Sequence, residues 1–371
     1  MLKLDKRDFL CNYWQQQPLL ISGALDPFVA PLSADELAGL ALEAHVESRI
    51  IEYRKGQWSL LHGPFSEADF QRPGPWTLLV QSVDHHVPPV AELRKLVSFI
   101  PQWRIDDVMM SYAVDGASAG PHYDHYDVFL LQSEGERLWR IGQRCNADTP
   151  ILNHDELRIL EAFHCEQEYL LRPGDILYVP PGVAHWGIAQ GECTTFSIGF
   201  RAPRIVDLIS RWADSAFEQT DADLFYTDTV REQEARPGEI SAMEIAHASE
   251  QVRRAIAADT EGQWFGELVT EAKDDYRLDD AELELARQRL CQPQAVTLSA
   301  TAKLAWTQQS MNVSVFANGE YRVFAVSILD TLIALCESWH LSGQRLRKAS
   351  AQKEGSKLLE FLLDTGCIDV E

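Results

Sequence analysis

The stretch LRPGDILYVPPGVAHWG, Leu171–Gly187, alternates rigid turns with a short apolar run. Pro173–Asp175 carries the residue types of a tight turn, and Pro180–Gly182 carries the same chemistry. The apolar residues Ile176–Val179 between the two turns predict a short strand. His185 therefore enters the next strand from a rigid corner, where a side chain can be held in a fixed direction.

Similar β-rich runs extend on both sides of this stretch, from about Val108 to Phe200, with Gly, Pro and Asp at the turns between them. Ser133–Gly135 is expected to be one of these turns. Many short strands at this spacing favour a sandwich or a small barrel. The predicted strands are VMMSYAV (108–114), DVFLLQ (127–132), RLWRIG (137–142), EYLLRPGD (168–175), HWGIA (185–189) and TTFSIGF (194–200).

The regions on either side of these predicted strands have different residue patterns. Residues 1–100 mix helical and extended signals, with a helix expected to start at Ala34–Leu37 and an extended run at Trp58–Leu61. After Arg204 the apolar spacing becomes helical, and a hairpin with Asn318–Gly319 at its turn follows. A hairpin between helices suggests a winged-helix-like module. The predicted helices cover 205–219, 240–257, 264–272 and 279–289.

Composition limits the partners and the compartment. The 371 residues favour two or three domains, and 56 acidic against 33 basic residues give a net charge of −23. Such a chain repels nucleic acid and attracts basic proteins. The seven cysteines form no C-x-x-C pair, the N-terminus has no apolar leader, and no apolar run approaches a membrane span. A soluble cytoplasmic protein without a membrane partner is expected.

The segment GPHYDHYDVF, Gly120–Phe129, contains two His-x-Asp motifs. Residues i and i+2 of an extended chain share a face, so either His122 pairs with Asp124, or His125 pairs with Asp127. Together with His185, either pair forms the two-histidine, one-carboxylate triad that binds non-haem Fe(II) and leaves coordination positions open. The pattern alone does not choose between the two pairs.

The spaced motifs resemble those of the JmjC, or cupin-4, ribosomal oxygenases, which are Fe(II)- and 2-oxoglutarate-dependent protein hydroxylases. The resemblance covers at least residues 9–204. It is carried by YWQQQPLLISGAL (13–25), GPHYDHYDVF (120–129), GERLWRIG (135–142), LRPGDILYVPPGVAHWG (171–187) and FSIGFRAP (196–203).

The resemblance implies the roles of individual residues. In that family the metal histidine directly follows Gly-Pro, so the implied ligands are His122, Asp124 and His185. The implied anchor for the distal carboxylate of 2-oxoglutarate is Arg137, and Ser111 matches a position whose hydroxyl helps to hold the same carboxylate. A guanidinium suits this task because its planar fork meets a carboxylate bidentately. His125 and Asp127 would then face away from the metal and form ordinary structural hydrogen bonds.

The resemblance also implies an architecture. The expected class is α+β, with a double-stranded β-helix (jelly-roll, JmjC cupin) core. The expected domains are a catalytic domain over 1–204, a helical region over 205–275 that forms a homodimer, and a winged-helix-like domain over 276–371.

The implied activity uses Fe(II), 2-oxoglutarate and O2 to hydroxylate the β-carbon of an arginine in the sixteenth protein of the large ribosomal subunit. The net charge of −23 suits a basic ribosomal protein. Asp106, Asp107 and Asp115 are candidate partners for a guanidinium. Nucleic acid is not an expected partner.

The residues leave four alternatives open. One is hydroxylation of a ribosomal-protein histidine, as in eukaryotic relatives. Another is a cupin metalloenzyme that acts on a small molecule and does not need Arg137. A third is a binding protein that kept the barrel without its activity, and demethylation by the same chemistry is also compatible with the sequence.

Overall fold

The computed structural model describes residues 2–228, 230, 238–256, 262–273 and 277–371. These residues form two compact units, 1–202 and 203–371. The predicted boundary near residue 204 falls close to the junction of the two units. The predicted boundary at 275/276 and the end of the predicted helix at residue 257 lie outside the described residues.

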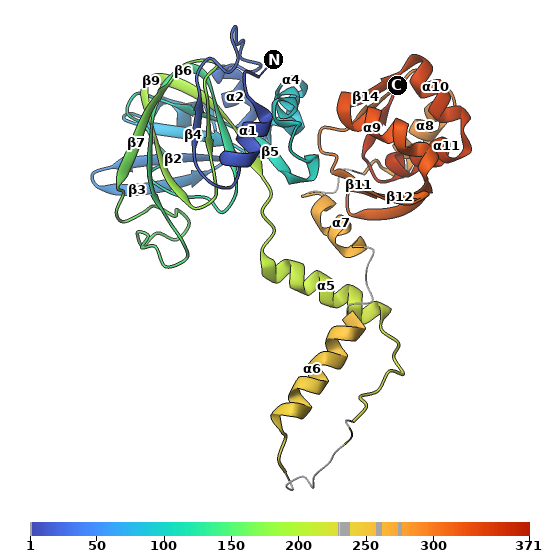
Figure 1. The fold of residues 1–371 in the computed structure, drawn as a ribbon. Helices are drawn as coiled ribbons and strands as arrows, with labels where there is room; N and C mark the ends of the chain where they lie inside the picture. Colours follow the sequence, from blue (N-terminus) through green and yellow to red (C-terminus); the bar gives the residue numbers. More distant parts are fainter. Residues whose placement is uncertain (1, 229, 231–237, 257–261, 274–276) are drawn as a thin grey trace. The chain divides into compact units, whose positions relative to one another are not determined.

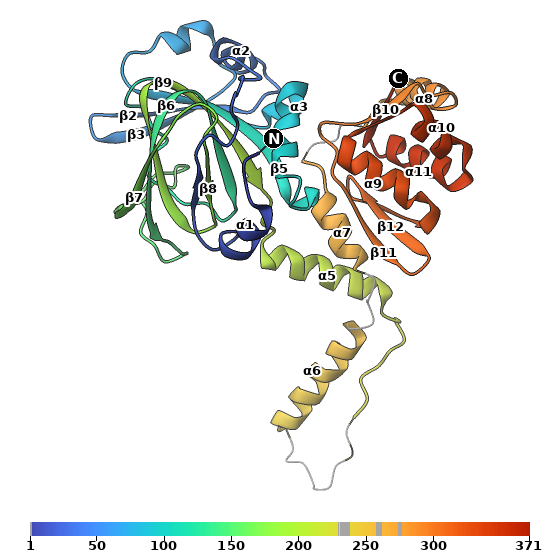
Figure 2. The ribbon, with the colours of Figure 1, turned by 45° about the horizontal axis from the view of Figure 1, so that its top comes forward.

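The first unit is built on one antiparallel sheet that curves strongly (Figures 1 and 2). The strand order is β1-β8-β6-β9-β5-β4-β2-β3, and β7 pairs with β6. The strands are β1 Leu19–Ile21, β2 Ser48–Arg54, β3 Gln57–His62, β4 Trp76–Val80, β5 Ile105–Ala113, β6 Val128–Arg144, β7 Cys165–Leu171, β8 Ile176–Val179 and β9 Val183–Phe200.

Two long strands, β6 and β9, form the centre of this sheet, whereas the sequence predicts four short strands over the same residues. β6 pairs with β8 through its first half and with β7 through its second half, while β9 follows it over most of its length. The predicted turn at Ser133–Gly135 is wrong, because β6 continues through it with a register shift. Gly135 adopts a φ of 63°, which allows a bulge where a turn was expected.

Helices on the flank of the sheet close the core of this unit. They are α1 Lys6–Asn12, α2 Ala34–Leu40, α3 Val83–His86 and α4 Pro88–Ala91. The Asp5 carboxylate caps α1, and Ser33 with Glu36 forms a capping box on α2. Phe9 of α1 is fully buried against Phe129 and Tyr178 of the sheet, so the N-terminal segment is part of the hydrophobic core.

The bulge at Gly135 gives a stability prediction. A Cβ at this position would overlap the backbone carbonyl oxygen of Glu192, and the positive φ disfavours any L side chain. We expect Gly135→Val to lower the free energy of unfolding by about 3 kcal/mol. A thermal melt followed by circular dichroism measures the change.

Gly56 provides the matched control for this prediction. It also has a positive φ, of 82°, but no atom lies within 4 Å of the place that a Cβ would occupy, so Gly56→Val carries the backbone strain without the overlap. Equal melting temperatures for the two variants would contradict the role given to the bulge.

The second unit contains helices and two small antiparallel sheets. The three-stranded sheets have the orders β14-β10-β15 and β11-β12-β13. The elements are α5 Ile205–Gln219, α6 Ala242–Ile256, α7 Gln263–Thr270, α8 Asp280–Leu290, β10 Ala295–Leu298, β11 Leu304–Gln309, β12 Asn312–Ala317, β13 Glu320–Ala325, α9 Leu329–Ser338, β14 His340–Ser342, α10 Gly343–Ala351, α11 Lys353–Asp364 and β15 Ile368–Val370.

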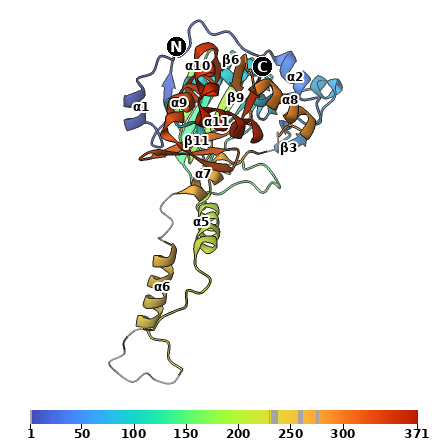
Figure 3. The same ribbon diagram turned by 90° about the vertical axis from the view of Figure 1, so that its right-hand side faces the viewer.

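The predicted hairpin is present as β12 and β13, with positive φ at both Asn318 and Gly319. Helix α7 covers one face of the β11-β12-β13 sheet, and the C-terminal helix α11 packs on the other face (Figure 3). Phe324 of β13 packs against Phe361 of α11 with ring centroids 5.8 Å apart. Among the described helices, none has the length and hydropathy that crossing a bilayer requires.

Candidate metal centre

His122 and His185 meet through their backbones. The two residues form an isolated antiparallel bridge, in which His122 N donates to His185 O at 3.1 Å and His185 N donates to His122 O at 2.8 Å. Apart from this bridge, residues 123–127 lie outside the strands, whereas the face-sharing argument for the two His-x-Asp pairs assumes an extended chain. The bridge nevertheless sets the two imidazoles side by side, with ring centroids 4.4 Å apart.

Both imidazoles are oriented by backbone carbonyls. The Nδ1 atom of His122 lies 2.9 Å from Gly120 O, and the Nδ1 atom of His185 lies 3.0 Å from Val183 O. Each Nδ1 therefore carries the proton and donates it, which leaves Nε2 with a lone pair. Burial, followed by the neighbouring His122, lowers the pKa of His185 to about 4. His185 is therefore neutral at pH 7, the form that ligates a metal.

Asp124 completes the cluster. Its Oδ2 lies 3.5 Å from His185 Nε2, and one potential ligand atom from each of His122, Asp124 and His185 lies within 4.8 Å of the others. Its backbone oxygen accepts a hydrogen bond from Gly182 N at 2.8 Å, which ties the segment to the Pro180–Gly182 corner. Two imidazoles and one carboxylate are a donor set that fits Fe(II).

The second His-x-Asp pair lies elsewhere. Asp127 is fully buried and accepts hydrogen bonds from the Tyr178 hydroxyl at 2.6 Å, from Arg104 Nη2 at 3.2 Å and from the Gln15 side-chain amide. His125 is exposed and packs its ring against Tyr123. The structure thus brings His185 together with the first pair, while Asp127 links the N-terminal segment to the sheet.

The triad lines a pocket of about 370 Å³, and Arg137 lies in the same pocket. Arg137 is 7% exposed, and its Nη1 donates to Ser111 Oγ at 3.2 Å. Its Nε lies 3.4 Å from Cys193 Sγ. The remaining nitrogen, Nη2, is buried and has no hydrogen-bond partner among the described residues. A buried guanidinium with a donor to spare indicates an anionic ligand in this part of the pocket.

Two further buried polar atoms line the same pocket without a partner among the described residues, namely Thr77 Oγ1 and Trp139 Nε1. These donors and Arg137 Nη2 suit a small acid with several oxygens, such as 2-oxoglutarate. The sequence analysis missed both residues. Trp139 lies two positions after Arg137 on β6, so the same-face rule was a usable signal, whereas nothing local distinguishes Thr77.

Carboxylates line another part of the pocket. Along β5, the positions of Asp107, Met109 and Ser111 share one face, so an acid and the serine beside Arg137 lie on one strand. Asp106 also lines the pocket and pairs with Arg201 at 3.3 Å. Asp115, the third acid considered from the sequence, does not line this pocket and instead accepts from Gly191 N at 2.7 Å.

Comparison with known proteins places this chain in a family. The family model for the JmjC domain matches residues 92–208, and the model for the AraC-like ligand binding domain matches residues 162–273. The ribosomal protein uL16 3-hydroxylase of Escherichia coli is 37% identical over 273 residues, which cover 73% of each chain. The chain belongs to the JmjC family of ribosomal oxygenases.

Further relatives of this ribosomal oxygenase support the assignment. A probable ribosomal oxygenase of Haemophilus influenzae is 33% identical over 334 residues, which cover 84% of this chain and 81% of the relative. The crystal structure of E. coli YcfD is similar over 100% of this chain and 99% of its own, with a TM-score of 0.86 and 32% identity. Another structure of YcfD, with a TM-score of 0.82 and 31% identity, contains cobalt and 2-oxoglutarate. The ribosomal oxygenase described here therefore has the mixed α/β JmjC cupin fold.

Proposed function

We propose that this chain is an Fe(II)- and 2-oxoglutarate-dependent hydroxylase that acts on the β-carbon of an arginine in ribosomal protein uL16. One observation carries the proposal. A single pocket contains the His122, Asp124 and His185 cluster, the buried guanidinium of Arg137 and the carboxylates of Asp106 and Asp107. It offers a place for a metal, for an acidic cosubstrate and for a cationic side chain.

The proposed roles follow from the donor atoms. His122, Asp124 and His185 would hold the iron, and Arg137 with Ser111 would hold the distal carboxylate of 2-oxoglutarate. Bound iron supplies the activation of O2, in which 2-oxoglutarate loses CO2 to give succinate and the substrate C–H becomes C–OH. The chain itself orients the reactants and limits the access of water, through buried walls such as Leu130 and Trp139.

The carboxyl groups of Asp106 and Asp107 in the pocket favour a cationic side chain such as that of arginine over an uncharged one. Asp107 is nearly fully buried, and its Oδ2 is held by Gln81 Nε2 at 2.8 Å and by Ser82 N at 3.0 Å. The Ser82 hydroxyl also donates to this oxygen at 2.8 Å, so the carboxylate is held in place and contributes a fixed negative charge to the pocket wall, which favours a cationic side chain nearby. The charge of −23 also favours the encounter with a basic ribosomal protein. A ribosomal substrate implies the cytoplasm as the location, and nucleic acid is not proposed as a partner.

Mass spectrometry tests the proposal. Recombinant uL16 is incubated with the enzyme, Fe(II), 2-oxoglutarate and O2, and we expect a gain of one oxygen on a single arginine. The matched control is uL16 with that arginine replaced by lysine, which should gain no oxygen. Oxygen on a histidine, or turnover of 2-oxoglutarate that is independent of any protein substrate, would contradict the proposed substrate.

We further propose three domains along the chain. They are the catalytic JmjC domain over 1–204, a dimerisation region over 205–275 and a winged-helix-like domain over 276–371. Apolar side chains exposed on the helices support a homodimer. They include Ile205, Val206, Ile209 and Phe217 of α5, and Met243, Ile245 and Val252 of α6. Helices α9, α10 and α11 with the adjacent hairpin support the winged-helix comparison.

The dimer gives a specific prediction. Phe217 is 85% exposed in the isolated chain, so Phe217→Asp is expected to weaken dimerisation on the order of tenfold or more by placing a charge in an apolar interface. Light scattering across a dilution series measures this. Val29→Asp is the matched control, since Val29 is 83% exposed in the first unit. A wild-type chain that is monomeric at all concentrations would contradict the proposed dimer.

A further inference from the structure

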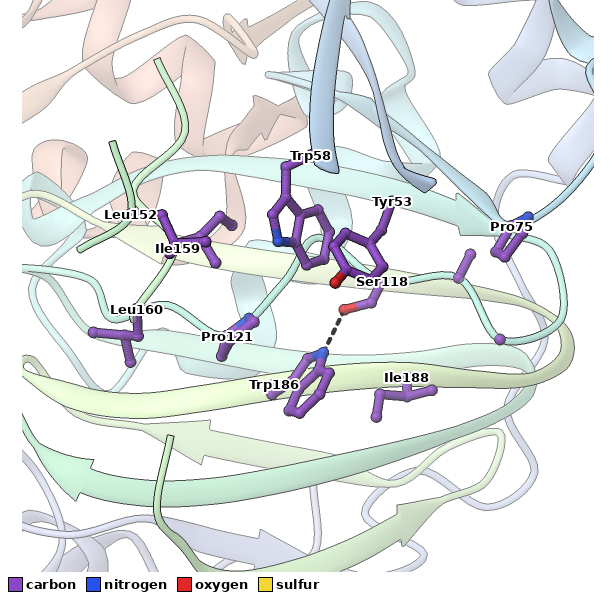
Figure 4. A pocket seen from close by; sticks show the side chains of 12 residues that line it. Tyr53, Trp58, Pro75, Ser118, Pro121, Leu152, Ile159, Leu160, Trp186 and Ile188 are labelled. Atoms are coloured by element: carbon purple, nitrogen blue, oxygen red, sulfur yellow. Dashed lines mark hydrogen bonds between the residues drawn. The ribbon is translucent and has the colours of Figure 1, made fainter. Parts of the chain in front are cut away.

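A second pocket, of about 320 Å³, lies next to the metal pocket in the first unit. Figure 4 shows Tyr53 and Trp58 on one side of it and Trp186 on the other. Aliphatic side chains complete the wall, among them Leu152, Ile159 and Ile188. The ring centroids of Tyr53 and Trp58 lie 4.6 Å apart, and Tyr53 is 50% exposed, so the aromatic pair remains accessible from solvent.

The chemistry of this pocket selects an uncharged apolar occupant. Within the described part of the chain, the residues that line it include no acidic or basic side chain. The indole Nε1 of Trp186 already donates to Ser118 Oγ at 2.8 Å, the hydrogen bond drawn in Figure 4. A charged ligand would lose its hydration here without gaining a partner, whereas an aliphatic side chain would gain contacts with the rings.

The two pockets share walls. Ile159 lines both of them, and the segment 152–160 supplies Leu152 and Leu160 to the apolar pocket and Glu156 to the metal pocket. Leu160 N donates to Pro121 O at 2.9 Å, which joins this segment to the residue that precedes His122. Trp186, in the apolar pocket, directly follows His185. The apolar pocket and the triad are therefore separated by the width of a single backbone segment.

We propose that the apolar pocket is a second substrate subsite, which takes an aliphatic side chain that flanks the hydroxylated residue in the same polypeptide. This inference rests on the proposed function, since it needs a protein substrate in the metal pocket. In an extended polypeptide, side chains follow at about 3.3 Å per residue and alternate in direction. A substrate chain that puts one side chain into the metal pocket can thus lay the side chain two residues away, which points to the same side, on Tyr53 and Trp58.

A nucleobase is the competing occupant, because bases also stack on aromatic rings. Two observations favour a protein side chain. The described pocket walls carry no basic residue to meet the phosphate that accompanies every base, and the chain has a net charge of −23. The experiment below treats RNA as one of its outcomes.

The test is a coupling experiment between enzyme and peptide variants. The probe is a synthetic uL16 peptide that spans the hydroxylated arginine, together with variants in which each flanking apolar residue is replaced singly by serine. The full-length enzymes are the wild type, Tyr53→Ala, Trp58→Leu and the matched control Leu61→Ala. Leu61 is 42% exposed on the same strand as Trp58 and lines neither pocket. Mass spectrometry gives kcat/KM for each pair, and KM for 2-oxoglutarate checks that the metal pocket is intact.

With the wild type and with Leu61→Ala, one serine substitution should lower kcat/KM about tenfold or more. With Tyr53→Ala or Trp58→Leu, the same serine substitution should lower kcat/KM about twofold or less, since the subsite that holds the substituted side chain is already lost. Equal losses in all four enzymes would overturn the inference. Competition by an RNA oligonucleotide that disappears in Trp58→Leu would overturn it in favour of a base. No product from any peptide would overturn the proposed function and this inference together.

Discussion

Replacing His185 with alanine is expected to remove both the metal and the activity. His185 supplies a neutral, buried imidazole whose Nδ1 donates to Val183 O, so its Nε2 is the ligand atom. Without it, only His122 and Asp124 remain of the described ligand cluster. Loss of a group that merely orients a ligand costs about 10- to 100-fold in metal affinity, and loss of the ligand itself should cost at least about 100-fold. Calorimetric titration with Co(II) and succinate formation measure the two effects.

His125→Ala is the matched control for this variant. His125 lies three residues from His122, but its side chain is exposed and packs on Tyr123. Its metal affinity and turnover should equal those of the wild type. Loss of Co(II) from His125→Ala would point to the second His-x-Asp pair, and retention of Co(II) by His185→Ala would remove His185 from the ligands; either result would contradict the proposed site.

Replacing Arg137 with methionine is expected to raise KM for 2-oxoglutarate about 100-fold. The buried guanidinium has one nitrogen without a partner in the described residues, and hydrogen bonds to a charged group contribute about 3 kcal/mol. That free energy corresponds to about 100-fold in affinity. The KM of Arg137→Lys for 2-oxoglutarate should fall between the values for the wild type and Arg137→Met. Lysine keeps the positive charge but lacks the planar guanidinium that meets a carboxylate with two hydrogen bonds.

Succinate formation at varied 2-oxoglutarate concentration measures these constants. Arg172→Met serves as the matched control, because Arg172 is exposed and pairs with Glu136 at 3.0 Å outside the pocket. Co(II) affinity separates the roles further, since Arg137→Met should bind the ion normally in the absence of 2-oxoglutarate. An unchanged KM in Arg137→Met would contradict the assignment of the anchor.

Much of the fold was predictable from local chemistry. Proline and glycine fix the corners around Ile176–Val179, and the apolar spacing of Ile205–Gln219 matches α5. The continuity of β6 and β9 was not predictable, because Gly135 and Gly191 look like turn residues. Pairing between the two long strands holds these glycines inside the sheet, so a tertiary interaction overrides the local preference.

The candidate site shows the same limit. Two His-x-Asp pairs have equal spacing, and the local pattern does not separate them. In the structure, Asp127 is drawn into the core by Gln15, Arg104 and Tyr178, residues from distant parts of the sequence. Thr77 was missed for the same reason, because its place in the pocket depends on how β4 lies in the sheet. Only the family resemblance, in which the metal histidine directly follows Gly-Pro, favoured the first pair.

The reciprocal backbone hydrogen bonds between residues 122 and 185 have a consequence for the apoenzyme. Because main-chain atoms fix the spacing of the two imidazoles, that spacing does not depend on a bound cation. Treatment with a chelator should abolish turnover while leaving the circular dichroism spectrum unchanged, and simple addition of Fe(II) should restore turnover without refolding. A cell short of iron would then keep a reserve of folded, idle enzyme that recovers as soon as the supply returns.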